Sequence, residues 1–147
     1  MGKKILFWVD PTLVDFAMAK FLEEKYEKYA IIETNQGKEF YQQQKLVKFN
    51  KIWFFRDCFS NLNFKPDLEY LQKFEEKYKI NLWQIVYSDI TFNQYNTHYS
   101  FSNDEILRIL ETQCKFFEKV LDETNPDFFI IKVTDMSYMV ILQKMCQ

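Results

Sequence analysis

Apolar residues form short unbroken runs near both ends of the chain, and each run leads into a turn that carries an aspartate. Residues 5–9 are apolar and precede Asp10, while the run within residues 127–131 precedes Asp135 by a few positions. Continuous apolar runs of this length are typical of strands buried on both faces of a parallel sheet. We therefore predict a first and a last strand at these positions, each followed by a helix.

The first half of the chain also predicts one helix and two further strands. Thr12 can cap a helix whose apolar positions recur at Leu13, Phe16, Ala17 and Phe21. Residues 29–33 and 51–55 have the composition of strands, and the turn at residues 35–37 follows the first of them. Residues 40–50 show no clear period, so no element is predicted there.

The second half of the chain predicts mainly helices. Pro66 opens one helix, and residues 82–92 fit either a helix or a strand, of which we favour the helix. The clearest helix covers residues 103–123, where Ser102 and Glu105 form a capping box and Asn125 with Pro126 ends the element. Together these elements predict an α/β fold: one Rossmann-like three-layer domain over residues 1–147, with a mainly parallel sheet.

Composition narrows the function classes. Hydrophobic residues make up 48% of the chain and aromatic residues 19%, which predicts a folded domain with an aromatic core. The net charge of -2 argues against a nucleic-acid binder. One basic strip, residues 38–56, interleaves cations with aromatic rings; it suits either an anionic ligand or a solvated turn, and we favour the turn.

Several site types are not expected. The cysteines Cys58, Cys114 and Cys146 form no CxxC pair, which predicts reduced thiols and a cytoplasmic protein without a structural zinc site. No apolar run is long enough for a membrane span. The two glycines form no phosphate-binding loop, so no dinucleotide cofactor is expected, and the carboxylates show no metal-ligand spacing.

Some segments resemble a known family. Residues 81–83 and 87–89, together with residues 116–121 and the junction at 125–127 that leads into the apolar run 129–131, resemble the amino-terminal region of glycosyltransferase-like proteins of surface or capsular polysaccharide biosynthesis. The resemblance implies a GT-B arrangement of two Rossmann-like domains, of which this chain would be the amino-terminal half. That half would contact the carbohydrate acceptor, and a second domain would hold the nucleotide-sugar donor. Little or no transferase activity is then expected from this chain alone.

Candidate site residues follow from the position of strand ends, because ligands of such sheets bind outside the carboxyl ends of the strands. Asp10 and Asp135 are candidates for a base that orients or deprotonates a sugar hydroxyl, with helix capping as the alternative for each. His98, the single histidine, is the third catalytic candidate. The ligand-binding candidates are Thr12, Arg56, Asp57, Asp89 and Thr134. A local ion pair is the alternative for Arg56 and Asp57, and a surface position is the alternative for Asp89.

Two other interpretations remain open at this point. Asp10, Asp57 and Lys132 each follow a predicted strand and mimic the acidic pocket, phosphoacceptor and lysine of a response-regulator receiver, although only one acidic residue follows the first strand. A non-catalytic α/β domain that binds a ligand or a protein partner is the alternative to a transferase. The sequence does not indicate an oligomeric state.

Overall fold

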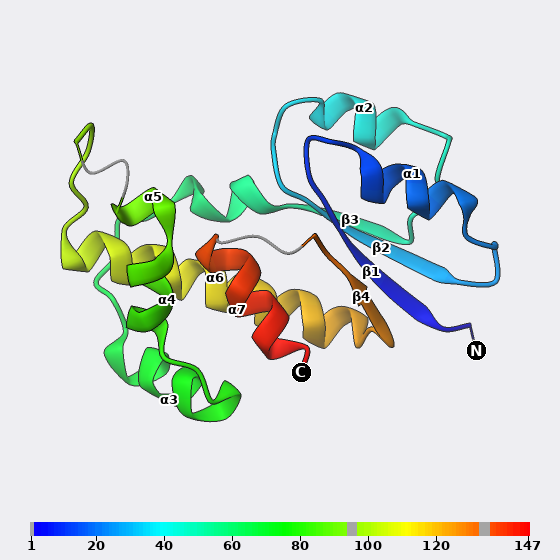
Figure 1. The fold of residues 1–147 in the computed structure, drawn as a ribbon. Coiled ribbons are helices and arrows are strands. Elements are labelled where there is room, and N and C mark those ends of the chain that lie inside the picture. The colour runs from blue at the N-terminus through cyan, green and yellow to red at the C-terminus, as the bar shows by residue number, and fades with distance from the viewer. Residues whose placement is uncertain (1, 94–96, 133–135) are drawn as a thin grey trace. The chain divides into compact units, whose positions relative to one another are not determined.

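The computed structural model describes residues 2–93, 97–132 and 136–147. The chain divides into two compact units: residues up to 60 with residues 119–132 form the first, and residues 61–118 with those from 133 onward form the second. The first unit contains every strand of the sheet, while the second is built from helices (Figure 1).

The first unit is organised around a four-stranded sheet. Its strands are β1 (Lys4–Val9), β2 (Glu27–Ile32), β3 (Lys51–Phe54) and β4 (Phe128–Ile130). Their order is β3-β2-β1-β4, and every neighbouring pair is parallel. In register, Phe7 of β1 lies opposite Ala30 on one side and Ile130 on the other. The predicted α/β fold with a parallel, Rossmann-like sheet is confirmed.

Two helices, α1 (Val14–Phe21) and α2 (Lys38–Gln43), pack against one face of this sheet. Alternate β1 residues Ile5, Phe7 and Val9 contact a core that includes Phe16 of α1 and Tyr41 of α2. The intervening residues Leu6 and Trp8 are also fully buried, on the opposite face. Both faces are therefore covered, which explains why the strands read as continuous apolar runs.

The start of α1 differs from the prediction. Thr12 does not cap this helix: Leu13 precedes Val14 with a left-handed backbone (φ 61°), and no side chain caps the helix. Instead, the Thr12 backbone N–H and hydroxyl both donate to Oδ1 of Asp10. The side chain of Asp10 thus closes the turn, and the Thr12 hydroxyl is no longer available as a cap.

The remaining part of the first unit agrees in outline with the predicted strands. β3 runs directly into the 3-10 helix η1 (Phe55–Ser60), and α2 occupies the stretch in which no element was predicted. Asn125, with φ 42°, lies between helix α6 (Asn103–Thr124) and β4. The helix therefore ends at the Asn125-Pro126 pair, as predicted.

The second unit comprises α3 (Leu68–Tyr78), α4 (Leu82–Ser88), α5 (Ile90–Asn93), most of α6 (Asn103–Thr124) and α7 (Ser137–Met145). The capping box of α6 is confirmed: the Ser102 backbone N–H donates to Glu105 Oε2 at 2.8 Å, and the Glu105 N–H donates to Ser102 Oγ at 3.3 Å. The unit has its own core, formed by apolar side chains that are almost fully buried: Leu71, Phe74, Leu82, Val86, Leu110, Ile141 and Leu142.

The helix predicted over residues 82–92 is interrupted. Asp89 has an extended backbone between α4 and α5, and the side chain of Asn93 donates to the backbone carbonyls of Val86, Tyr87 and Asp89. The carbonyls of Val86 and Asp89 also accept the backbone N–H groups of Asp89 and Asn93, so the Asn93 side chain adds to the backbone bonds that end α4. Among the described residues, no helix is both long and apolar enough to cross a membrane.

Candidate functional site

The strand order places a topological switch point between β1 and β4. From β1 the chain continues to β2 and β3 on one side, and β4 joins the opposite side of β1. The carboxyl ends of all four strands meet at one edge because the sheet is parallel (Figure 1). Ligands of open parallel sheets bind at this edge, where strands to either side diverge. The residues after β1 and β4 are therefore the first place to look for a site.

Asp10 and Lys132 lie on either side of this switch point. Asp10 follows β1, and its carboxylate is largely buried, with an overall exposure of 8%. Oδ1 accepts the Thr12 N–H at 2.9 Å, while Oδ2 lies 3.8 Å from Nζ of Lys132. Lys132 follows β4 and is well exposed. The pair thus combines a carboxylate held in one orientation with an ammonium group that solvent reaches.

Asp15 adds a second buried carboxylate to this region. It lies in the first turn of α1 and is 7% exposed, and among the described residues no side-chain donor contacts it. Burial, and after it the negative charge of Asp10, raises the pKa of Asp15, while Lys132 acts in the opposite direction. We refer to Asp10, Thr12, Asp15 and Lys132 as the switch-point cluster.

A second polar cluster follows β2 and β3 at the same edge. The carboxylate of Asp57 accepts a hydrogen bond from the Asn35 amide at 3.1 Å and forms an ion pair with Lys38 at 2.6 Å. Lys38 also lies 4.7 Å from the centre of the Phe54 ring. Among the described residues, Asp57 is therefore paired with Lys38 and not with Arg56, the partner that the alternative expected. The guanidinium of Arg56 lies over the ring of Phe55 at 5.9 Å.

Asp89 is neither at the sheet edge nor on the surface. It belongs to the second unit, follows a helix and is 1% exposed. Oδ1 accepts the Thr91 N–H and Oδ2 accepts the Ser137 N–H, each at 2.7 Å. Asp89 therefore satisfies N–H groups at the starts of α5 and α7, and both of its oxygens are occupied by the backbone.

The other candidates are placed as follows. His98 lies in an exposed turn of the second unit. Asp135 and Thr134 lie outside the described residues. Of the candidates, Asp10 and Thr12 are brought together, and the partners that complete their cluster are Lys132 and Asp15. Sequence reasoning placed Lys132 after a predicted strand, but it had no signal that Lys132 and Asp15 lie near Asp10.

The receiver-like interpretation is wrong. That fold pairs its first strand with its third, in the order 2-1-3-4-5, so that an aspartate after each shares one pocket. Here β2 lies between β1 and β3. Asp57 is instead paired with Lys38, whereas Lys132 approaches Asp10.

The basic strip over residues 38–56 is partly neutralised. Lys38 and Lys51 form ion pairs with Asp57 and Glu123. Lys45 and Lys48 lie along a shallow hollow lined by Tyr41, Phe49 and Ile52. The strip is therefore divided by intramolecular ion pairs.

Other chemistries find little support in the described residues. Within ranges 2–93, 97–132 and 136–147, no group of three His, Cys, Asp or Glu side chains has the arrangement of a metal site. Burial raises the pKa of Cys58 to about 12 and that of Cys146 to about 11, so both thiols are protonated at neutral pH. The switch-point cluster, with two carboxylates and an ammonium group, suits hydrogen bonding to hydroxyl groups and proton transfer from them.

Comparisons of this chain with protein-family models, with curated proteins and with solved structures gave no match.

Proposed function

We propose that the first unit is the acceptor-binding domain of a glycosyltransferase-like protein of surface polysaccharide biosynthesis. The observation that supports this most directly is the pairing of Asp10 with Lys132 across the switch point between β1 and β4. The motif resemblance supplies the class of reaction, and the switch-point cluster supplies groups that suit a sugar hydroxyl.

The spacing of the pair suits a bridging hydroxyl. Asp10 Oδ2 and Lys132 Nζ are 3.8 Å apart, beyond direct hydrogen-bond distance. A hydroxyl oxygen can lie about 2.8 Å from both atoms, accepting from the ammonium group while donating its proton to the carboxylate. The fixed Oδ1 of Asp10, held by Thr12, keeps Oδ2 in place for this contact.

In the proposed reaction, the acceptor hydroxyl oxygen forms a bond to the anomeric carbon of a nucleotide-activated sugar. The bond from that carbon to the phosphate oxygen breaks, and its electron pair leaves with the nucleotide. Asp10 accepts the hydroxyl proton as the new bond forms. Lys132 orients the hydroxyl and balances the charge of Asp10 before the proton moves. The donor would be held by a second domain.

Binding to this chain can be tested without the donor. Backbone NMR spectra would be recorded while a panel of neutral, amino and acidic monosaccharides and disaccharides is added. We expect the amide signals of residues 10, 12 and 132 to move, and Asp10→Asn and Lys132→Met to weaken binding at least about tenfold. Glu123→Gln is the matched control, because it removes a carboxylate of the first unit that is ion-paired with Lys51.

Transfer is tested in a polypeptide that carries both domains. We expect Asp10→Asn to abolish donor-dependent transfer while the circular dichroism spectrum stays unchanged. Retained transfer would exclude Asp10 as the base. If sugars bind at residues 10, 12 and 132 but no transfer occurs with any donor, the non-catalytic alternative is correct. That alternative rests on the same fixed carboxylate, which binds a hydroxyl whether or not chemistry follows.

A further inference from the structure

Helix α1 is apolar on both of its sides, which is unusual for a helix at the surface of a domain. Phe16 and Ala19 point inward and are almost fully buried in the core of the first unit. On the other side, Val14, Ala17, Met18 and Phe21 are exposed. Their spacing of i, i+3, i+4 and i+7 places them on one stripe of the helix.

The exposure of this stripe is large. Val14 is 60% exposed, Met18 44% and Phe21 84%. Two further apolar side chains extend the patch: Leu13 just before α1 is 42% exposed, and Phe40 of α2 is 45% exposed and lies 5.7 Å from the Phe16 ring, between ring centres. We call Leu13, Val14, Ala17, Met18, Phe21 and Phe40 the α1 outer face.

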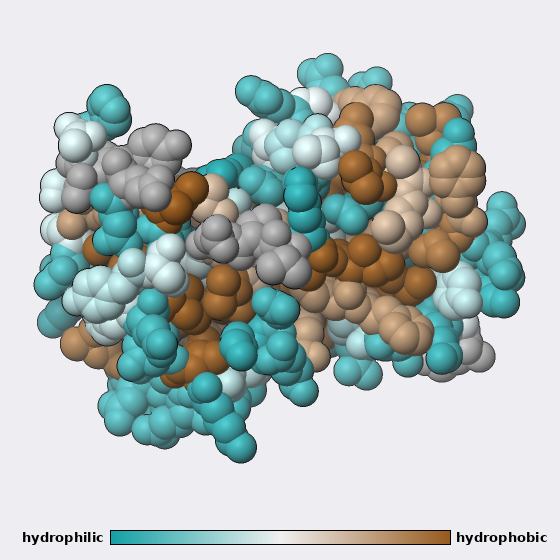
Figure 2. Space-filling model, in the orientation of Figure 1, coloured by the Kyte–Doolittle hydropathy of each residue, from teal (hydrophilic) through white to brown (hydrophobic). Residues whose placement is uncertain are grey.

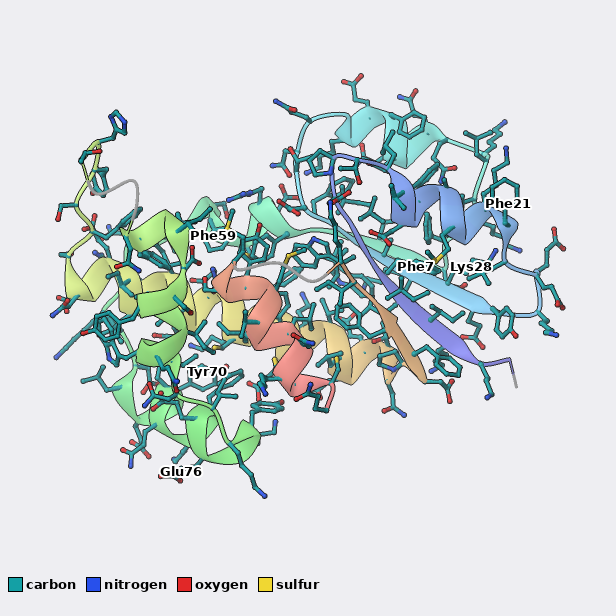
Figure 3. The ribbon with its side chains drawn as sticks, viewed as in Figure 1. Phe7, Phe21, Lys28, Phe59, Tyr70 and Glu76 are labelled. Atoms are coloured by element: carbon teal, nitrogen blue, oxygen red, sulfur yellow. The ribbon has the colours of Figure 1, made fainter. Side chains whose placement is uncertain are left out.

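The figures show how this face lies on the first unit. Apolar side chains gather over α1 in the space-filling view (Figure 2). In the view with side chains, Phe21 lies at the far end of α1, whereas Phe7 and Lys28 lie between this helix and the strands (Figure 3). Nζ of Lys28 donates to the Ala19 and Leu22 carbonyls at 3.0 and 2.9 Å, so the end of α1 is firmly attached to β2.

We propose that the α1 outer face is a dimerisation surface, on which the α1 helix of one copy packs against the α1 helix of a second copy. A contact of a surface with its own copy about a two-fold axis needs only one self-complementary patch. Ala17, at the centre of the stripe, has a small side chain that lets two helix backbones approach closely. Phe21 and Met18 can then pack beside it against the same residues of the partner.

The area of the face suits a modest dimer. Its exposed apolar surface amounts to about 500 Å² per copy, taking about 200 Å² for a fully exposed large side chain. Two copies would then bury on the order of 1,000 Å² of apolar surface together with a polar rim, which is the lower end of specific interfaces. Patches of this size on a domain surface commonly mark interaction sites.

The charges beside the face favour a second copy over a lipid surface. The exposed charged residues at and after the end of α1 are Lys20, Glu23, Glu24 and Lys25, two of each sign. Binding to an anionic membrane needs a basic rim, and this rim is balanced. Glu23 and Lys25 already form an ion pair with each other at 2.8 Å. Of these four charges, Lys20 and Glu24 can therefore pair with the opposite charges of a second copy.

Sedimentation equilibrium over a range of chain concentrations tests the proposal. We expect a monomer–dimer equilibrium, in which Phe21→Ser raises the dissociation constant at least about 30-fold and Met18→Lys prevents association. Tyr87→Ser is the matched control, because Tyr87 is 75% exposed but belongs to the second unit. This variant should dimerise like the parent chain.

Circular dichroism of each variant verifies that it is folded. Three outcomes would overturn the proposal: a parent chain that remains monomeric at several hundred micromolar, association that Phe21→Ser leaves unchanged, or open-ended growth beyond a dimer. Binding of the monomer to phosphatidylglycerol vesicles through Phe21, without dimerisation, would assign the face to a lipid surface and would equally overturn it. Because sugar binding is measured at residues 10, 12 and 132, none of which belongs to the α1 outer face, the two proposals can fail independently.

Discussion

We expect that replacing Asp89 will strongly lower the stability of the second unit, because its side chain holds two helix starts together. Its carboxylate is 1% exposed and accepts N–H groups from Thr91 and Ser137. Replacing Asp89 with Ala removes both acceptors and leaves two N–H groups at helix starts without partners. Since a hydrogen bond to a charged group contributes about 1.5–3 kcal/mol, we expect the free energy of unfolding to fall by about 3–5 kcal/mol.

Two variants calibrate this value. Asp89→Asn keeps one carbonyl oxygen but replaces the other acceptor with an NH₂ group, so it should lose about half as much, about 1.5–3 kcal/mol. Asp57→Ala removes a carboxylate with a similar number of bonds, but in an exposed position. Exposed ion pairs contribute about 1 kcal/mol or less, so this control should change stability little.

Urea unfolding followed by circular dichroism measures all three variants. A loss of 3–5 kcal/mol lowers the midpoint by at least about 1 M, because small proteins lose about 1–3 kcal/mol of stability per molar urea. Hydrogen exchange at Thr91 and Ser137 locates the effect. If Asp89→Ala is no less stable than Asp57→Ala, the role of Asp89 in joining α5 and α7 is refuted.

Three further predictions concern titration and packing. The pKa of Asp15 is raised in the folded state, so the free energy of unfolding falls as the pH rises from the ordinary value of 3.8 through the raised pKa. The Asp15→Asn variant should not show this fall and should be more stable than the parent at pH 7. Urea unfolding across a pH series measures both effects. A hydrogen bond from the Tyr99 hydroxyl, and after it those from Ser102, lower the pKa of Glu105 to about 2. Protection of the first turn of α6 from hydrogen exchange should therefore be complete above pH 4.5 and decline as the pH falls toward about 2. In Glu105→Gln this acid dependence should disappear. Leu110 is fully buried, and Leu110→Ala should cost about 2–5 kcal/mol in urea unfolding, whereas Leu68→Ala at a 63% exposed position should change stability by about 0.5 kcal/mol or less.

Local chemistry was readable from the sequence at some positions where the partners are close along the chain. The capping box of Ser102 and Glu105 formed as predicted, because its geometry needs only one helical turn. The strands could also be predicted, because burial on both faces of the sheet leaves an unbroken run of apolar residues. Thr12 shows the limit: Asp10 and Thr12 compete for the same turn, and residue type alone does not determine which side chain caps the backbone.

Asp89 shows a different limit. A carboxylate between Ser88 and Ile90 has the sequence signature of a surface residue. Its burial is compensated by two N–H donors, one of which belongs to Ser137, 48 positions later. Similarly, α1 has apolar residues on two opposite sides, and the sequence pattern does not distinguish the side that meets the core from the side that remains exposed. In both cases the missing information is the partner across space, which hydrophobic periodicity does not contain.

The candidate site depends on strand order more than on any motif. Asp10 and Lys132 are separated by more than a hundred residues, and the apolar pattern marks the ends of their strands without stating which strands are neighbours. If β4 had joined the sheet beyond β3, Lys132 would lie next to Asp57, whose charge Lys38 already balances. Because β4 instead pairs with β1, its lysine meets the carboxylate at the switch point. The functional proposal therefore follows from the order β3-β2-β1-β4, and removing the charge of Lys132 tests that consequence of the fold directly.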